Sequence, residues 1–280
     1  MSPTDAAGFR TADDVPEELR EDLNALLLSL ADNKRLLGMR YAEWLLGAPT
    51  LEAGIACSAM AQDEWGHSRI LYAMLKDFGE DPGQLEHQRE ADQYLNSELL
   101  DEPPGEWTGL VVLNLLLDAA LSVQFESLKD SRFEPLHYKV RKVLEEERFH
   151  FEHGRGWIAR MAQTSTGREA LQEALTPAWI SCLRWFGAPD GGLIARLADA
   201  GVSDAGPDEL RARWLDRVGP IVHEAGLGLA AQDEGGAWRS AVDLDWSDWD
   251  GSRRRSGGGS LNAETLAGVR GDKNRAMLMD

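Results

Sequence analysis

The chain has 280 residues, of which 43% are hydrophobic, and 48 acidic against 29 basic residues give it a net charge of −19. This length allows one large domain, or one domain with an extension. The acidic balance excludes nucleic acid as a partner for the surface as a whole. The two cysteines, Cys57 and Cys182, are too few for a disulfide framework or a cysteine metal site and fit a reducing cytoplasm.

The first half of the chain predicts a helical hairpin. Residues 1–16 are polar and acidic, unlike a secretory signal or a transit peptide, and we predict that they are disordered. Apolar residues then recur at helical spacing over residues 17–47 and 51–77. The short Ala-Pro-Thr joint at 48–50 predicts that these helices are antiparallel, with Thr50 as the N-cap of the second helix.

A second pair of helices follows a long connection. Residues 79–106 contain three glycines and three prolines and predict a crossover. Helices are predicted at 107–130 and 136–163, and we find no apolar run long enough to predict a membrane partner. A helix pair, a crossover and a second pair predict an all-α, ferritin-like four-helix bundle.

The C-terminal third extends this bundle. Residues 167–187 and 207–230 predict two additional helices, so we assign the helical domain to residues 17–231. Residues 232–280 predict an extended, irregular tail that ends in a short helix. Within this tail, residues 243–250 are acidic and residues 252–260 (SRRRSGGGS) predict a flexible basic joint.

The sequence contains two Glu-x-x-His motifs, Glu64 to His67 and Glu147 to His150, which are its candidate metal-binding motifs. Residues three apart in a helix share one face, so each motif points a carboxylate and an imidazole in the same direction. Such motifs on two helices of a four-helix bundle provide ligands for di-iron or di-manganese centres. A single copy is more often a surface pair, whereas one copy in each hairpin favours a metal site.

In an antiparallel hairpin, residues equally far from the turn lie at the same height, and these mirror positions add candidates to the ligand set. Asp118 lies in an apolar run at the height of Glu147 and His150, so we predict that it is the fifth ligand. At the matching height of the first helix the chain has Asp32 and Lys34. Asp32 offers a carboxylate, whereas Lys34 has the wrong charge for a ligand, and its ammonium could replace the charge of one iron.

Residues around these motifs have less specific patterns. Asp63 and Glu146 could fix the histidine tautomers, but we expect them to be ordinary exposed acids. Arg35 and Arg40 could meet a phosphate of an acyl-CoA, although solvated helix faces have the same pattern.

Two sets of residues carry a resemblance to one family. The stretches LADNKRLLGMRYAEWLLGAPTLE, HFEHGRGWIARM and RRRSGGGSLNAETL resemble the C-type subunit of the bacterial phenylacetyl-CoA epoxidase complex. AQDEWGH, Asp118 and EERFH instead resemble the metal-binding motifs of its catalytic A-type subunit. Both subunit types have the ferritin-like fold, so one resemblance does not exclude the other. The resemblance to the C-type subunit covers most of the chain from about residue 24 to the end.

The resemblance implies two alternative functions. Like the A-type subunit, the chain would bind one or two non-haem irons through Glu64, His67, Asp118, Glu147 and His150, and would act with a reductase on phenylacetyl-CoA. Like the C-type subunit, it would be a non-catalytic scaffold for the A-type subunit, with Lys34 in ion pairs. A free-standing oxidase with its own substrate is a third possibility.

Overall fold

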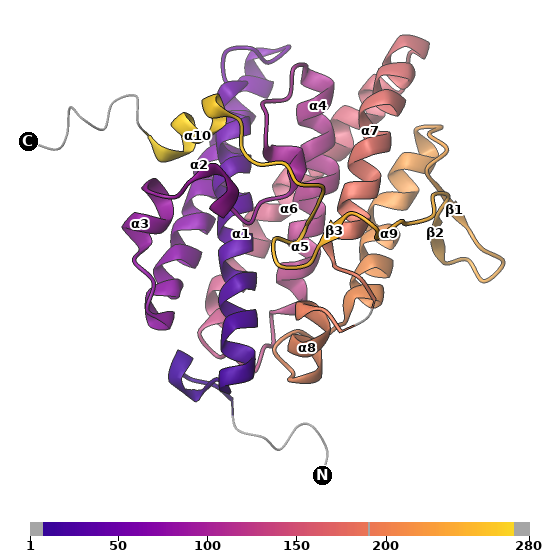
Figure 1. The fold of residues 1–280 in the computed structure, drawn as a ribbon. Coiled ribbons are helices and arrows are strands. Elements are labelled where there is room, and N and C mark those ends of the chain that lie inside the picture. The colour runs from indigo at the N-terminus through magenta and orange to yellow at the C-terminus, as the bar shows by residue number, and fades with distance from the viewer. Residues whose placement is uncertain (1–7, 190, 272–280) are drawn as a thin grey trace, which may run out of the picture.

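The computed structural model describes residues 8–189 and 191–271. Its long helices run along a common direction (Figure 1). The bundle consists of α1 (Glu17–Glu43), α2 (Leu51–Leu75), a third helix and α6 (Leu136–Met161). The third helix combines α4 (Trp107–Val112), a π-helical turn (Leu113–Leu117) and α5 (Asp118–Ser127). The predicted all-α class is confirmed, and the helix order agrees with a ferritin-like bundle.

The α1–α2 hairpin is closed by the predicted cap. The Thr50 side chain accepts a hydrogen bond from the Ala53 amide at 3.2 Å, as an N-cap residue does. Gly54 lies directly against the carbonyl of Leu45, and a Cβ at this glycine would be 2.4 Å from that oxygen. The hairpin therefore needs glycine here, and the two helices remain in close contact along their length.

The π-helical turn interrupts the third helix immediately before Asp118. A π turn inserts one extra residue into an α-helix and is frequent at functional sites. Gly154 of α6 faces this turn, where a Cβ would be 2.8 Å from Oδ1 of Asn114. The turn and this glycine together let Asn114 reach into the bundle.

The third helix is long and apolar enough to span a membrane. By length and composition the segment Trp107–Ser127 could cross a membrane, contrary to the expectation from the sequence. However, 89% of its most apolar stretch is buried inside the fold, which is typical of the central helix of a bundle.

The connection between the hairpins contains α3 (Pro82–His87) and three short 3-10 turns (Lys76–Phe78, Ala91–Gln93 and Glu98–Leu100). After the bundle come α7 (Ser165–Trp185), α8 (Leu193–Asp199) and α9 (Pro207–Glu224). The sequence pattern did not predict α8. Trp179 of α7 and Trp214 of α9 contact each other with ring centroids 4.7 Å apart, and Trp214 donates to the carbonyl of Leu116 at 3.0 Å.

The tail crosses the bundle from α9 back to α1 (Figure 1). It contains two antiparallel strand pairs, β1 (Ala230–Gln232) with β2 (Trp238–Ser240) and β3 (Trp249–Asp250) with β4 (Arg255–Ser256), and ends in α10 (Ala263–Arg270). The segment predicted as a flexible joint is packed: Arg255 is buried and pairs with Asp101. The prediction differs because a run of arginines and glycines does not reveal which acids it will meet.

The segment predicted to be disordered is also packed where the structure describes it. Phe9 donates its backbone N–H to the carbonyl of Arg132 at 2.6 Å, and Phe9, Ala12 and Val15 are buried. The polar composition of the segment concealed these three apolar anchors. Residues 1–7 lie outside the described residues.

Candidate functional site

All five predicted ligands converge in the bundle interior. Glu64 and His67 come from α2, Asp118 from α5, and Glu147 and His150 from α6. Each has at most 3% of its surface exposed. The two Glu-x-x-His motifs therefore face each other across the bundle, as their spacing predicted. That these residues hold a metal stays a prediction.

The ammonium of Lys34 lies among the carboxylates. Lys34, on α1, is fully buried, and its Nζ donates to Asp118 Oδ1 and Glu147 Oε1 at 2.6 Å each and to Glu64 Oε1 at 3.1 Å. These three contacts satisfy the three donors of an ammonium ion. One cation thus binds a carboxylate from each of the other three bundle helices.

Three further side chains complete the cluster, and sequence reasoning missed them. Tyr41 donates to Asp118 Oδ2 at 3.0 Å, Asn114 donates to the Tyr41 hydroxyl at 2.8 Å, and Ser122 donates to Glu147 Oε2 at 3.0 Å. Tyr41 is two helical turns after Lys34, and Asn114 and Ser122 are each four residues from Asp118. Helical spacing puts all three on the inner face and could have identified them.

The two acids expected to be merely exposed instead contact the histidines. Glu146 Oε2 is 2.6 Å from Nε2 of His67, and Asp63 Oδ2 is 3.3 Å from Nε2 of His150. Both acids are partly exposed, at 32% and 38% of their side chains. That expectation was wrong, because each acid precedes a buried Glu and its side chain bends back over the histidine of the other helix. Such outer carboxylates orient an imidazole and favour its protonated form.

The inner nitrogens of the histidines face the carboxylates. His67 Nδ1 is 3.1 Å from Glu147 Oε1, and His150 Nδ1 is 3.2 Å from Asp118 Oδ2 and 3.3 Å from Glu64 Oε1. Each histidine therefore lies between carboxylates on both sides.

The cluster shifts the pKa values of its members in opposite directions. Burial opposes charge on Lys34, but the carboxylates of Asp118, Glu147 and Glu64 outweigh it and raise the pKa of Lys34. Burial likewise opposes protonation of His150, but the hydrogen bond to Asp118 and the charge of Glu147 raise the pKa of His150 to about 12. Burial and the Asp118 charge raise the pKa of Glu64 to about 7, whereas Lys34 and His150 hold the pKa of Asp118 well below its ordinary value.

These shifts describe a cluster that balances its own charge. The pKa of His67 is also raised, because the hydrogen bond and charge of Glu147 outweigh its burial. The ammonium of Lys34 and the favoured protonated forms of the two imidazoles thus offset the negative charge of the buried carboxylates. Burial of charge is tolerated when the charges are paired and hydrogen-bonded.

The side chains of the cluster fit a single metal ion better than a pair of irons. Glu64, Asp118, Glu147 and His150 offer ligand atoms that all lie within 4.8 Å of one another, so this buried group could hold a metal ion. It does not fit a pair of irons as arranged. Lys34 replaces the acid that α1 would supply, and its Nζ contacts the same carboxylates that would bridge the metals.

Asp32, the alternative sixth ligand, is not part of the cluster. It is fully buried but receives hydrogen bonds from Tyr72 at 2.6 Å, from the Leu95 amide at 2.8 Å and from Nη1 of Arg89 at 2.9 Å. The reason is the helical rotation of about 100° per residue, which turns positions 32 and 34 to nearly opposite faces of α1. Asp32 therefore anchors the crossover and not a metal.

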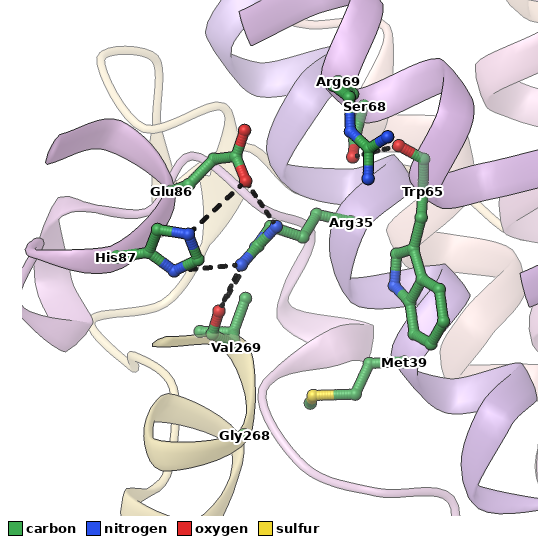
Figure 2. A pocket seen from close by; sticks show the side chains of 9 residues that line it. All are labelled: Arg35, Met39, Trp65, Ser68, Arg69, Glu86, His87, Gly268 and Val269. Carbon is green, nitrogen blue, oxygen red and sulfur yellow. Dashed lines mark hydrogen bonds and ion pairs between the residues drawn. The ribbon is translucent and has the colours of Figure 1, made fainter. Parts of the chain in front are cut away.

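A cavity of about 350 Å³ lies on the outer side of α1 and α2 (Figure 2). Arg35, Trp65 and Ser68 line it, each one residue after a member of the cluster and so turned away from it. Figure 2 shows Arg35 bound to its neighbours: it pairs with Glu86 at 3.0 Å and donates to the Val269 carbonyl at 2.6 Å. Arg40 is likewise bound, to Thr265 and the Leu100 carbonyl. The described contacts thus use both arginines to fasten the tail and the crossover.

The raised pKa values predict how stability depends on pH. A group whose pKa is higher in the folded chain stabilises the fold below its unfolded pKa and loses this contribution as pH rises through its folded pKa. For His150 the window runs from 6.5 to about 12. We therefore expect the free energy of unfolding to be lower at pH 9 than at pH 6. Urea denaturation at both pH values checks this.

The matched control for this pH series is His150→Gln, which removes the titrating group with the largest window. The difference between pH 6 and pH 9 should be smaller in the variant than in the wild type. A wild-type chain that is equally stable, or more stable, at pH 9 would contradict the paired imidazolium.

Comparison with known proteins identifies the family of the chain. A model of the family described as phenylacetic acid catabolic protein matches residues 4–240. The chain is also similar to the C-type subunit of 1,2-phenylacetyl-CoA epoxidase from Escherichia coli (strain K12), with 29% identity over 210 residues that cover 74% of this chain and 84% of that protein. Because the family model spans most of the chain, the chain belongs to the phenylacetic acid catabolic protein family.

Proposed function

We propose that the chain is a C-type subunit of a multicomponent epoxidase that acts on an aromatic acyl-CoA, of which phenylacetyl-CoA is the expected substrate. In this complex it supports the A-type catalytic subunit, which works with a separate reductase in the cytoplasm. The similarity to the C-type subunit of the Escherichia coli epoxidase supports this proposal.

The observation that carries the non-catalytic assignment is the position of Lys34. Its Nζ contacts Glu64, Asp118 and Glu147 at 3.1 Å or less. A metal with the same ligands would need these oxygens, and an ammonium ion among them repels a second cation. The cluster then acts as a polar core that holds the four bundle helices in register.

A second candidate function keeps an iron site in this chain. The mutual proximity of Glu64, Asp118, Glu147 and His150 favours it. Carboxylate and imidazole ligands suit non-haem iron. In this case the chain would itself contribute to oxygen chemistry.

The two functions are separated by His150→Gln, assayed in the complete complex of this chain with its A-type subunit and reductase. A scaffold predicts that the variant still forms the complex and that the epoxidation rate stays within about twofold of the wild type. An iron site predicts a fall of at least about 10–100-fold, the usual cost of changing even the outer partner of a metal ligand.

The control for this assay is His223→Gln, which changes an exposed histidine outside the cluster. Gel filtration of each variant with the A-type subunit shows whether the complex is intact. A large loss of activity in an intact His150→Gln complex would contradict the scaffold assignment.

A further inference from the structure

A buried arginine, Arg254, lies far along the chain from the cluster and has no described acid beside it. Arg254, in the turn before β4, is 3% exposed, and it has no ion pair among the described residues. Its Nη2 donates to the carbonyl of Trp185 at 3.0 Å, and its guanidinium lies 4.3 Å from the centre of that indole. Nη1 is buried without a hydrogen-bond partner in the described part of the chain.

Arg254 lines a cavity of about 180 Å³ between α7, α8, α9 and the tail. Glycines make up much of the wall, at Gly187, Gly191, Gly192 and Gly251, and Trp249 closes one side. No carboxylate lines the cavity among the residues that the structure describes. A cavity, a buried cation and an Nη1 without a described acceptor thus coincide at Arg254.

The backbone at Arg254 has an uncommon conformation. Its φ is +51°, and it is the one non-glycine residue with positive φ in the described ranges. Such a conformation is uncommon for a long side chain and is retained where the surroundings determine it. Burial lowers the pKa of Arg254 to about 9, so the guanidinium is still charged at neutral pH.

A buried, charged guanidinium with a free N–H strongly favours an anionic acceptor. Its planar donor geometry matches the oxygens of a carboxylate or a phosphate. We propose that this cavity binds a small oxyanion, which pairs with Arg254. The site is separate from the buried cluster and does not depend on the proposed function.

Inorganic phosphate and acetate are the probes, and thermal unfolding with tryptophan fluorescence is the readout, at constant ionic strength set with sodium chloride. Ligand at ten times its dissociation constant raises the ratio of folded to unfolded chain about 11-fold. We expect a saturable rise in Tm and a fluorescence change from Trp249 with at least one probe. A stronger response to phosphate would identify a phosphate site, and a stronger response to acetate a carboxylate site.

Two variants remove the site in different ways. Arg254→Met removes the cation and should abolish the response. Ala188→Glu keeps Arg254 but adds a carboxylate to the cavity wall, so it should also abolish the response and remains informative if Arg254→Met does not fold. Arg69→Met, at an exposed arginine elsewhere, is the matched control and should respond like the wild type.

Asp190 lies outside the described residues but is close in sequence to the cavity wall, so Asp190→Asn tests whether it is the natural counter-ion. The proposal predicts that this variant responds at least as strongly as the wild type. The proposal is overturned if the wild type shows no saturable response to either probe. This includes the outcome in which only Asp190→Asn responds, because Asp190 would then be the counter-ion of Arg254. It is equally overturned if a folded Arg254→Met or Ala188→Glu responds like the wild type.

Discussion

Lys34→Met is expected to lower the free energy of unfolding by about 3–5 kcal/mol, the usual cost of removing one partner of a buried charge pair. Methionine keeps most of the side-chain volume but removes the ammonium that contacts Glu64, Asp118 and Glu147. The loss should be smaller at pH 5 than at pH 8, because the carboxylates can take up protons in place of the lost cation. Urea denaturation at the two pH values measures both effects.

Lys142→Met is the control for this measurement. Lys142 lies on the exposed face of α6, and its replacement should change the free energy of unfolding by less than about 0.5 kcal/mol. If Lys34→Met were as mild as Lys142→Met, the carboxylates would have another source of positive charge, and a bound metal would be the first candidate.

Lys34→Glu is expected to convert the cluster into a metal site. The substitution puts a carboxylate on α1 beside Glu64, Asp118 and Glu147, so that all four bundle helices supply an acid. Without metal these like charges repel, and the variant should unfold at a lower temperature than the wild type. Ferrous iron supplied anaerobically should reverse this loss, by about 2.7 kcal/mol at a hundredfold excess over its dissociation constant.

The wild type and a double variant are the controls for this experiment. The wild type should show no comparable stabilisation by ferrous iron, because its ammonium already holds the same oxygens. Lys34→Glu combined with His150→Gln lacks one histidine ligand and should recover less stability than Lys34→Glu alone. An equal response of the wild type and Lys34→Glu to iron would show that Lys34 does not control the site.

The sequence predicted which five residues meet at the site, but it did not establish how their charges are balanced. Periodicity and mirror positions placed Glu64, His67, Asp118, Glu147 and His150 at one depth, because the bundle helices are regular and packed in antiparallel pairs. The same regularity gave the bounds of α1, α2 and α6 to within a few residues. Helical geometry is local, so it can be inferred from a single sequence.

What the sequence did not reveal depends on tertiary contacts. The roles of Asp63 and Glu146 require knowing that α2 and α6 face each other, so that each acid reaches the histidine of the other helix. The π turn before Asp118 has no simple residue signature. The packing of Phe9 and Arg255 likewise depends on residues distant in sequence, which composition does not identify.

A cluster of five residues of metal-ligand type around a lysine has a physical explanation. Once Lys34 supplies charge, removing any one acid would leave that charge unbalanced in the core, so the remaining residues stabilise each other. Selection for stability alone can then retain such residues whether or not they hold metal. The geometry of an inherited metal site is therefore compatible with a subunit that does not catalyse the reaction.

Iron content per chain, measured by elemental analysis of anaerobically purified wild type beside Lys34→Glu, tests most directly whether Lys34 takes the place of the metal. We predict far less than one iron per wild-type chain and a clear gain in the variant. About two irons in the wild-type chain would contradict this account and would support an oxygen-activating centre in this subunit.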